Sequence, residues 1–412
     1  MILKHGIVGL KDIKICIGTS LLVLITLEAS LLGGGRMLQF GPLTVKMWLY
    51  LAAQLYVILR LLSHGRLKLS SVVILLSLIV LLCLGVVIGI LQNSTPHLIG
   101  QDVSPLLYCF MLLFFEAVIQ TKEHLRIIVR IIESASLFMS FGLIAAIALL
   151  YLGVINFYTL YAWFQGSARE FTFRGDSGLF TFRGALYIGI GLILFAFEQN
   201  RLAKMALVVT AVGIAATGTR GFFVGFAVVI LVHILTGIMS LRRKLTYACI
   251  SCLCLILTGI MSSRVILSSG IASGKTAGDS MRVLTLQQIE DRITPWSFVF
   301  GNGLGVGVPV RPDHMEIAYA EIFQKQGLLG LMWWFSILVL LIMRYRKARR
   351  INYLQAQPLL LSAVFVIVTS ATNSYVDNPI GIFVWLVALV GLEVVSEEHT
   401  QAMLAQRKFA VS

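Results

Sequence analysis

The stretch LSSVVILLSLIVLLCLGVVIGIL, residues 69–91, contains no charged side chain. A helix of this length, rising about 1.5 Å per residue, crosses the roughly 30 Å of hydrocarbon in a bilayer. Inside lipid the backbone polar groups must find partners within the segment itself, and a helix satisfies all of them. We therefore expect residues 69–91 to form a membrane-spanning helix.

Apolar runs of this kind recur along the whole chain. With 58% hydrophobic and 13% charged residues and a mean hydropathy of +0.91, the composition leaves too little polar surface for a water-soluble fold. The sequence predicts an all-α polytopic membrane protein of about twelve transmembrane helices, forming a single domain over residues 1–412. The expected spans are 13–34, 43–62, 69–91, 105–119, 127–153, 185–199, 204–218, 222–239, 245–262, 326–343, 356–375 and 380–395.

The basic residues orient these spans. With the N-terminus in the cytoplasm, 21 of the 33 Lys and Arg residues fall in cytoplasmic segments, as the positive-inside rule requires. Both termini then lie in the cytoplasm, the second as a short polar tail at 396–412. Two long loops, 154–184 and 263–325, lie outside, and the larger one precedes the tenth span.

Arginines outside the membrane are the exceptions that carry information. Nine of the outer basic residues lie in the two long loops, where acidic residues accompany them, so their positions matter more than net charge. Arg220 lies in the tight turn TGTRG, residues 217–221, between two short spans. A guanidinium held there is costly unless an anion meets it, although anchoring to lipid phosphates is an alternative interpretation.

A second group of polar residues lies in loop 263–325. Arg282 is followed by a glycine run that includes Gly303 and Gly305, and then by His314 ahead of a span. Glycines allow backbone N–H groups to approach a phosphate, arginines bind phosphate through two hydrogen bonds, and a histidine can act as a base near neutral pH. The pattern predicts an anion site with a base on the outer face.

Several other patterns are decoys. The segment GIASGKT at 270–276 resembles a phosphate loop, but its glycines are one residue too close. The glycine run at 301–307 lacks the strand and acidic partner of a dinucleotide fold. The net charge of +14 is explained by membrane topology, so we expect no nucleic acid partner, and we also expect no cofactor and no bound metal.

Ionisable residues inside the expected spans are interpreted mainly as structural. They are Glu28, Glu116 and Glu133, near span ends, and His233, deeper in its span. For His233 we expect a hydrogen bond between helices, with a proton relay as the alternative.

The motifs at Thr217–Arg220, Arg282, Gly301–Gly305 and His314 through Gly327 and Gly330 occur in an order similar to one known family. The sequence resembles the O-antigen ligase and polymerase superfamily of bacterial inner-membrane glycosyltransferases. That family has about twelve spans and a large periplasmic loop before the tenth. The resemblance implies a bacterial inner-membrane protein with its site on the periplasmic face and a donor glycan carried on undecaprenyl pyrophosphate.

The resemblance also implies roles for individual residues in a metal-independent, inverting glycosyl transfer. Arg220 and Arg282 would bind the pyrophosphate and stabilise its charge as it leaves, and His314 would accept the proton of the attacking hydroxyl. Further substrate contacts are expected from Arg174, Arg292, Gly303, Gly305, Arg311, Glu316 and Tyr319.

The acceptor is left open. A polymerase would extend lipid-linked repeat units, and a spacing of eleven residues from Arg292 to Gly303 favours it, whereas a ligase would transfer the glycan to a lipid A core. The expected partners are the bilayer, the undecaprenyl-pyrophosphate-linked oligosaccharide, a chain-length regulator and a flippase.

Two other classes fit the sequence less well. A lipid-linked sugar flippase or transporter would place its charges near the midplane of the membrane, whereas this chain concentrates arginine outside. Glycosyltransferases with a carboxylate base usually carry acids in the first outer loop, and residues 33–42 contain none.

Overall fold

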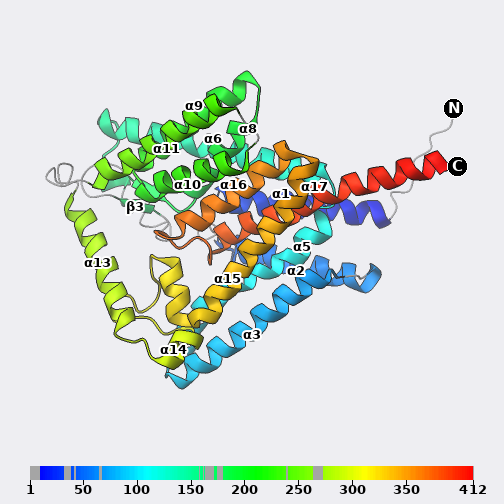
Figure 1. The fold of residues 1–412 in the computed structure, drawn as a ribbon. Helices are drawn as coiled ribbons and strands as arrows, with labels where there is room; N and C mark the ends of the chain where they lie inside the picture. Colours follow the sequence, from blue (N-terminus) through cyan, green and yellow to red (C-terminus); the bar gives the residue numbers. More distant parts are fainter. Residues whose placement is uncertain are drawn as a thin grey trace.

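The computed structural model describes residues 10–31, 39–40, 43–64, 67–156, 158–160, 162, 171–173, 180–237, 240–262 and 272–411. Within these residues the chain is mainly helical, with connecting loops and turns and two short antiparallel hairpins, β1 (Gln39–Phe40) with β2 (Leu43–Thr44) and β3 (Phe171–Phe173) with β4 (Phe180–Phe182) (Figure 1). The helices are α1 (Leu10–Leu31), α2 (Val45–His64), α3 (Leu69–Leu91), α4 (Pro96–Leu106), η1 (Leu107–Phe110), α5 (Met111–Val118), α6 (Lys122–Tyr151), α8 (Ala185–Phe197), α9 (Arg201–Thr217), α10 (Arg220–Thr236), α11 (Leu241–Ser262), α13 (Ala272–Glu290), α14 (Pro295–Phe300), α15 (Ala318–Ile351), α16 (Tyr353–Thr369) and α17 (Pro379–Val411).

The described parts of the twelve expected apolar runs fall largely on helical segments, and α3 begins and ends at the predicted residues. Among the described residues, six segments are long and apolar enough to cross a membrane: α2, α3, the α4–α5 segment, α6, α15 and α17. Shorter apolar helices include α8, α10 and α16. The expectation of an all-helical membrane protein is confirmed, while the number of spans stays a prediction.

The structure adds order to segments that the sequence assigns to loops and tail. Loop 263–325 contains α13 and α14 and the first turns of α15. Helix α15 begins at Ala318, but Gly327 interrupts it with φ 64° and ψ −158°, so the break falls where the tenth span was expected to begin. Helix α17 continues through the expected polar tail as far as Val411.

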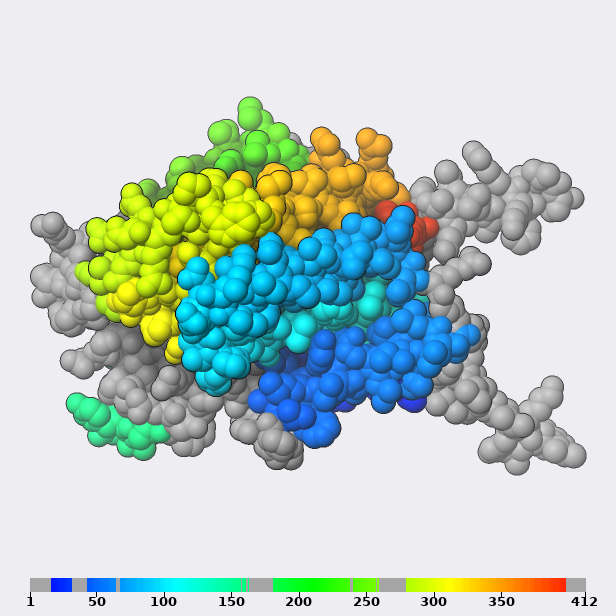
Figure 2. Space-filling model, turned by 90° about the horizontal axis from the view of Figure 1, so that it is seen from below, coloured from blue at the N-terminus to red at the C-terminus, as the bar shows by residue number. Residues whose placement is uncertain are grey.

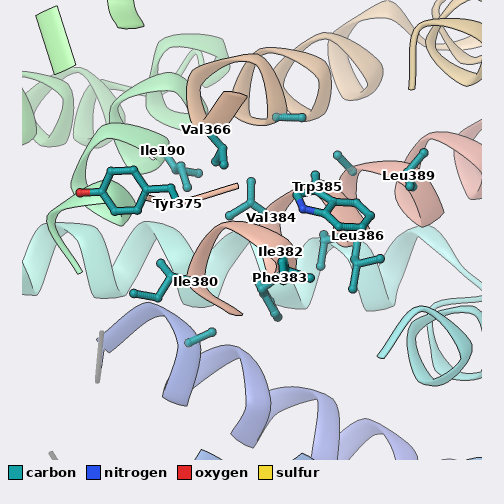
Figure 3. Close-up of a cluster of buried hydrophobic side chains, with 14 of the residues drawn as sticks. Ile190, Val366, Tyr375, Ile380, Ile382, Phe383, Val384, Trp385, Leu386 and Leu389 are labelled. Atoms are coloured by element: carbon teal, nitrogen blue, oxygen red, sulfur yellow. The ribbon is translucent and has the colours of Figure 1, made fainter. Parts of the chain in front are cut away.

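Helix α17 forms the centre of the apolar core. Its side chains from Ile380 to Val395 are almost all buried, and they pack against α15, α16, α5 and α1. Figure 3 shows Phe383, Trp385 and Leu386 among side chains from neighbouring helices, including Val366 of α16. A helix that is hydrophobic on every side can lie in the interior of the bundle, because it has no polar face that needs water.

Small residues let the surrounding helices approach closely. A Cβ added at Gly191 of α8 would lie 2.0 Å from Ser136 Oγ of α6, and one at Gly213 of α9 would lie 2.8 Å from Ser140 Oγ. Gly225 of α10 similarly faces Thr369 of α16. Membrane helices depend on such close van der Waals packing, because in lipid the hydrophobic effect does not drive helices together.

The glycine run at 301–305 passes between α3 and α15. The N–H of Leu304 donates to Gly85 O at 2.8 Å, and a Cβ at Gly303 would lie 2.2 Å from the backbone nitrogen of Gly89. Figure 2 shows the segment that contains this run beside α3 on one face of the molecule. These contacts hold the glycine run against the last turns of α3, and loop 306–317 continues from it.

We expect Gly327→Ala to lower the stability of the protein. The residue has φ 64°, which costs a residue with a Cβ about 1–2 kcal/mol, and its Cβ would lie 2.5 Å from Gly301 N. Thermal unfolding in detergent, followed by tryptophan fluorescence, measures the loss. Gly142→Ala on α6 is the control, because no atom lies within 4 Å of its added Cβ. Equal melting temperatures for the two variants would contradict the assigned backbone.

Candidate functional site

Six segments meet at the candidate site: α4, the start of α10, α13, loop 306–317, the start of α15 and the turn 370–378 between α16 and α17. Gly218, with φ 57°, ends α9 in the left-handed conformation and makes Arg220 the first residue of α10. The next residue is Gly221, whose added Cβ would lie 2.1 Å from Thr372 Oγ1. The glycine therefore lets turn 370–378 lie directly beside Arg220.

Three arginines and two carboxylates form what we call the arginine cluster: Arg220, Arg282, Arg311, Asp279 and Glu316. Arg220 Nη2 donates to both oxygens of Asp279, at 2.7 and 2.9 Å, and Arg282 Nη1 donates to the same residue at 3.2 Å. Arg282 Nε donates to Glu316 Oε2 at 2.9 Å, and Arg311 Nη2 donates to Glu316 Oε1 at 2.7 Å. The structure thus brings together four of the residues predicted from sequence.

The arginine cluster is partly open to solvent. Its side chains are between 23% and 47% exposed, and its ionised groups sum to one positive charge. Ion pairs with this much exposure contribute little to folding, typically about 0–1 kcal/mol. Guanidinium groups that are this accessible can also donate to an anionic ligand.

His314 is bound to a buried carboxylate. Its Nδ1 lies 2.9 Å from Oε1 of Glu321, and the other oxygen of Glu321 accepts from the N–H of Met315 at 3.0 Å. An ionised carboxylate only accepts, so we assign the proton to Nδ1, which leaves Nε2 with a free lone pair. The histidine side chain is about half exposed while Glu321 is buried. This is the arrangement of a general base with an orienting acid.

His314 and the neighbouring Asp377 both have shifted pKa values. Burial alone lowers the pKa of His314, but the hydrogen bond and charge of Glu321 and the charge of Asp377 outweigh it and raise the pKa above the usual value. Burial and then the charge of Glu321 raise the pKa of Asp377 to about 6, against the opposing effect of His314. His314 is therefore a stronger base than a free imidazole.

A buried lysine lies behind the histidine. Lys325 Nζ donates to Asp102 Oδ1 of α4 at 2.7 Å, to Glu321 Oε1 and to Asp313 O at 3.2 Å. The side chains of Lys325 and Asp102 are only 4% and 8% exposed. Buried charges of this kind are stable only when paired and hydrogen-bonded, which is the case here.

The glycines predicted to bind substrate have partners within the protein. Gly303 N–H donates to Lys325 O at 3.1 Å, and Gly305 N–H donates to Asp102 Oδ2 at 2.6 Å. These hydrogen bonds hold Asp102 and Lys325 in place. The expected contact of the two glycines with substrate stays a prediction.

A small open pocket of about 40 Å³ adjoins His314. Polar side chains from four segments line it: Gln101, Asp102, His314, Glu321, Lys325, Gln326 and Asp377. Water occupies cavities of at least about 10–15 Å³, so the pocket has room for a hydroxyl group or a few waters next to the base, and not for a whole sugar ring.

Other residues singled out from the sequence lie apart from these contacts. Arg292 Nη1 donates to Gly307 O at 2.7 Å, and the hydroxyl of Tyr319 donates to Ile367 O of α16 at 2.6 Å. Arg174 lies outside the described residues. The expectation for His233 is confirmed, since its Nδ1 lies 3.1 Å from Nε2 of Gln357 on α16.

Sequence reasoning placed Asp279 beside Arg282 in the outer cluster but assigned no site role to four other residues: Asp102, Glu321, Lys325 and Asp377. Two signals could have found some of them. Glu321 and Lys325 are four residues apart, which places them on one helical face. Asp102 lies next to an apolar run, where a charged residue is costly without a partner.

Comparison with known proteins adds a relative that aligns along nearly the whole chain. No protein-family model matches. The relative is 26% identical over 375 residues, which cover 90% of this chain and 92% of its own length. It is an O-antigen polymerase of Shigella flexneri. The chain is a distant homologue of that O-antigen polymerase, and the family resemblance expected from the motifs is confirmed.

We expect Glu321→Gln to lower the pKa of His314. The substitution removes the negative charge that stabilises the imidazolium, while burial still acts to lower the pKa. Titration of the protein labelled with ¹⁵N-histidine, followed by NMR, measures the shift. Asp291→Asn, at an exposed position after α13, should leave the pKa unchanged. An equally high pKa in the Glu321 variant would show that the carboxylate does not contact the histidine.

Proposed function

We propose that the chain polymerises a surface polysaccharide by transferring a growing glycan from undecaprenyl pyrophosphate onto the next lipid-linked repeat unit. The observation that carries this proposal is the His314–Glu321 pair, whose histidine lies on the loop that also carries Arg311 and Glu316 of the arginine cluster, in a homologue of an O-antigen polymerase. A base and an excess of cationic donors are the two elements that glycosyl transfer from a diphosphate donor needs.

The arginine cluster binds the donor. Arg220 and Arg282 contact the pyrophosphate through their guanidinium groups. Both guanidinium groups also pair with Asp279, whose side chain is 47% exposed. As the anomeric carbon–oxygen bond breaks, its electron pair goes to the pyrophosphate oxygen. The two arginines stabilise that negative charge, in place of a metal ion. Arg311 donates to Glu316, which also accepts from Arg282, so Arg311 lies close to that arginine. It is a candidate for sugar or phosphate contacts, as are Arg174, Arg292 and Tyr319.

His314 activates the acceptor. Its Nε2 takes the proton of the attacking sugar hydroxyl while the hydroxyl oxygen forms the new bond to the anomeric carbon. The configuration at that carbon inverts, because a single displacement attacks from the face opposite the leaving group. Glu321 stabilises the imidazolium that results.

We further propose that this reaction occurs at the periplasmic face of a bacterial inner membrane. The excess of basic residues in the short loops at the other end of the spans supports this orientation, with both termini in the cytoplasm and residues 1–412 acting as one domain of about twelve spans. The lipid tail of the donor then lies in the bilayer, its sugars lie outside, and a flippase and a chain-length regulator are the natural partners.

Reconstitution tests this function. Liposomes that contain the purified protein and lipid-linked repeat units should yield a ladder of longer lipid-linked glycans. Transfer to an added lipid A core instead would identify a ligase. Movement of unaltered substrate across the bilayer, without new glycosidic bonds, would identify a transporter and contradict the proposal.

We expect His314→Ala to reduce the rate of chain extension by about 10²–10⁴-fold, the usual contribution of a general base. The rate is measured in the liposome assay at equal amounts of folded protein. His124→Ala, at the start of α6, is the control and should extend chains at the normal rate. A normal glycan ladder from the His314 variant would remove the histidine from the mechanism.

We expect Arg220→Ala and Arg282→Ala each to reduce the extension rate by about 10²–10³-fold, the cost of losing one charge-stabilising donor. The matched control is Arg201→Ala, an exposed arginine at the opposite end of α9 from Arg220. If the Arg201 variant lost as much activity as the other two, a general effect of positive charge would explain the result.

A further inference from the structure

Lys325 is the buried cation that the proposed mechanism does not use. An ammonium group has three N–H donors, and those of Lys325 have three acceptors: Asp102 Oδ1, Glu321 Oε1 and Asp313 O. The acceptors come from α4, from the same helix α15 and from the loop. One ammonium therefore joins three segments of the fold.

Two of these acceptors are directly connected to His314. Glu321 Oε1 also lies 2.9 Å from His314 Nδ1, and Asp313 is the residue before His314 in the chain. Lys325 thus contacts both the side-chain partner of the imidazole and the backbone that carries it. An ion pair that served only to neutralise Asp102 would need neither contact.

Asp102 keeps the ammonium in place from the opposite side. Its second oxygen accepts from Gly305 N–H at 2.6 Å, so the carboxylate is bound on both sides. Helix α4 that carries it begins at a capped end, where Thr95 Oγ1 accepts from Leu98 N–H and Pro96 occupies the first helical position. The support behind Lys325 is therefore a rigid helix rather than a loop.

We propose that Lys325, anchored by Asp102, is a positioning residue that fixes Glu321 and the backbone at Asp313 together, so that His314 donates from Nδ1 and keeps Nε2 as the base. The inference rests on the proposed function of His314. It explains why a cation and two carboxylates are buried beside a half-exposed histidine. Desolvating these charges is costly. The cost is offset if Lys325 fixes the Glu321 carboxylate, because a fixed carboxylate holds His314 in one tautomer.

The decisive variants are Lys325→Met alone and Lys325→Met combined with Asp102→Asn. The single change leaves Asp102 and Glu321 without their cation. The double change removes the charges of both Lys325 and Asp102, so Asp102 is no longer a buried anion without a cation. We expect the double variant to recover melting temperature relative to the single variant but not the turnover number, which stays about 10²-fold reduced because the base is misplaced. The donor KM changes little, since the arginine cluster is separate.

A spectroscopic readout separates positioning from stability. The ¹⁵N shifts of His314 report which ring nitrogen carries the proton. We expect one tautomer, protonated at Nδ1, in the unmodified protein and a mixture in both Lys325 variants. Lys347→Met, an exposed lysine near the other end of α15, is the matched control and should leave turnover and tautomer unchanged.

The outcomes distinguish this inference from the function on which it rests. A double variant with normal turnover and a single His314 tautomer overturns the positioning role, and His314→Ala measured in parallel then shows whether the base assignment stands. If His314→Ala itself retains activity, the proposed function fails first. Where neither Lys325 variant folds, Asp102→Asn alone decides: the inference requires a lower turnover number at unchanged donor KM, and unchanged turnover overturns it.

Discussion

Backbone-to-backbone contact at the glycine run is the constraint on which the site depends. A Cβ at Gly301 would lie 2.4 Å from Gln326 N, and one at Gly303 would lie 2.2 Å from Gly89 N. Only residues without side chains allow the run to lie between α3 and α15 at this distance. That contact brings Gly305 to Asp102 and positions the start of loop 306–317. The position of His314 beside Glu321 therefore depends on the close packing of the glycines that precede it.

The protein uses charge in two different ways within one site. The arginine cluster is partly exposed and its carboxylates share their partners, so a ligand can replace or join them without exposing a buried ion. Lys325, Asp102 and Glu321 are less than a tenth exposed and have complete hydrogen bonding. The first group is suited to recognition and the second to preorganisation, in which geometry is set before the substrate arrives.

Hydropathy made most of the fold predictable, because lipid as a solvent imposes the same demand on every spanning segment. The ends of α3 and the break of α15 at Gly327 follow from local pattern. The arginines and His314 were also recognisable, because basic residues in the two long loops depart from the pattern expected of translocated segments, and His314 follows a glycine run. The contact of Asp102 with Lys325 joins residues 223 positions apart, and no local pattern encodes it. Local pattern also does not encode the contact of Asp279 with Arg220, which belongs to another helix. Nor does it encode the hydrogen bonds that the glycine N–H groups donate to Lys325 and Asp102.

The buried position of α17 has a consequence for biosynthesis. The ribosome makes this helix after all the helices that enclose it, so α1, α5 and α6 enter the membrane before their central partner exists. Until then the surfaces that will face α17 lack this partner. Contacts this distant in sequence form slowly. Completion of the core therefore depends on α17, which follows the other core helices in the chain.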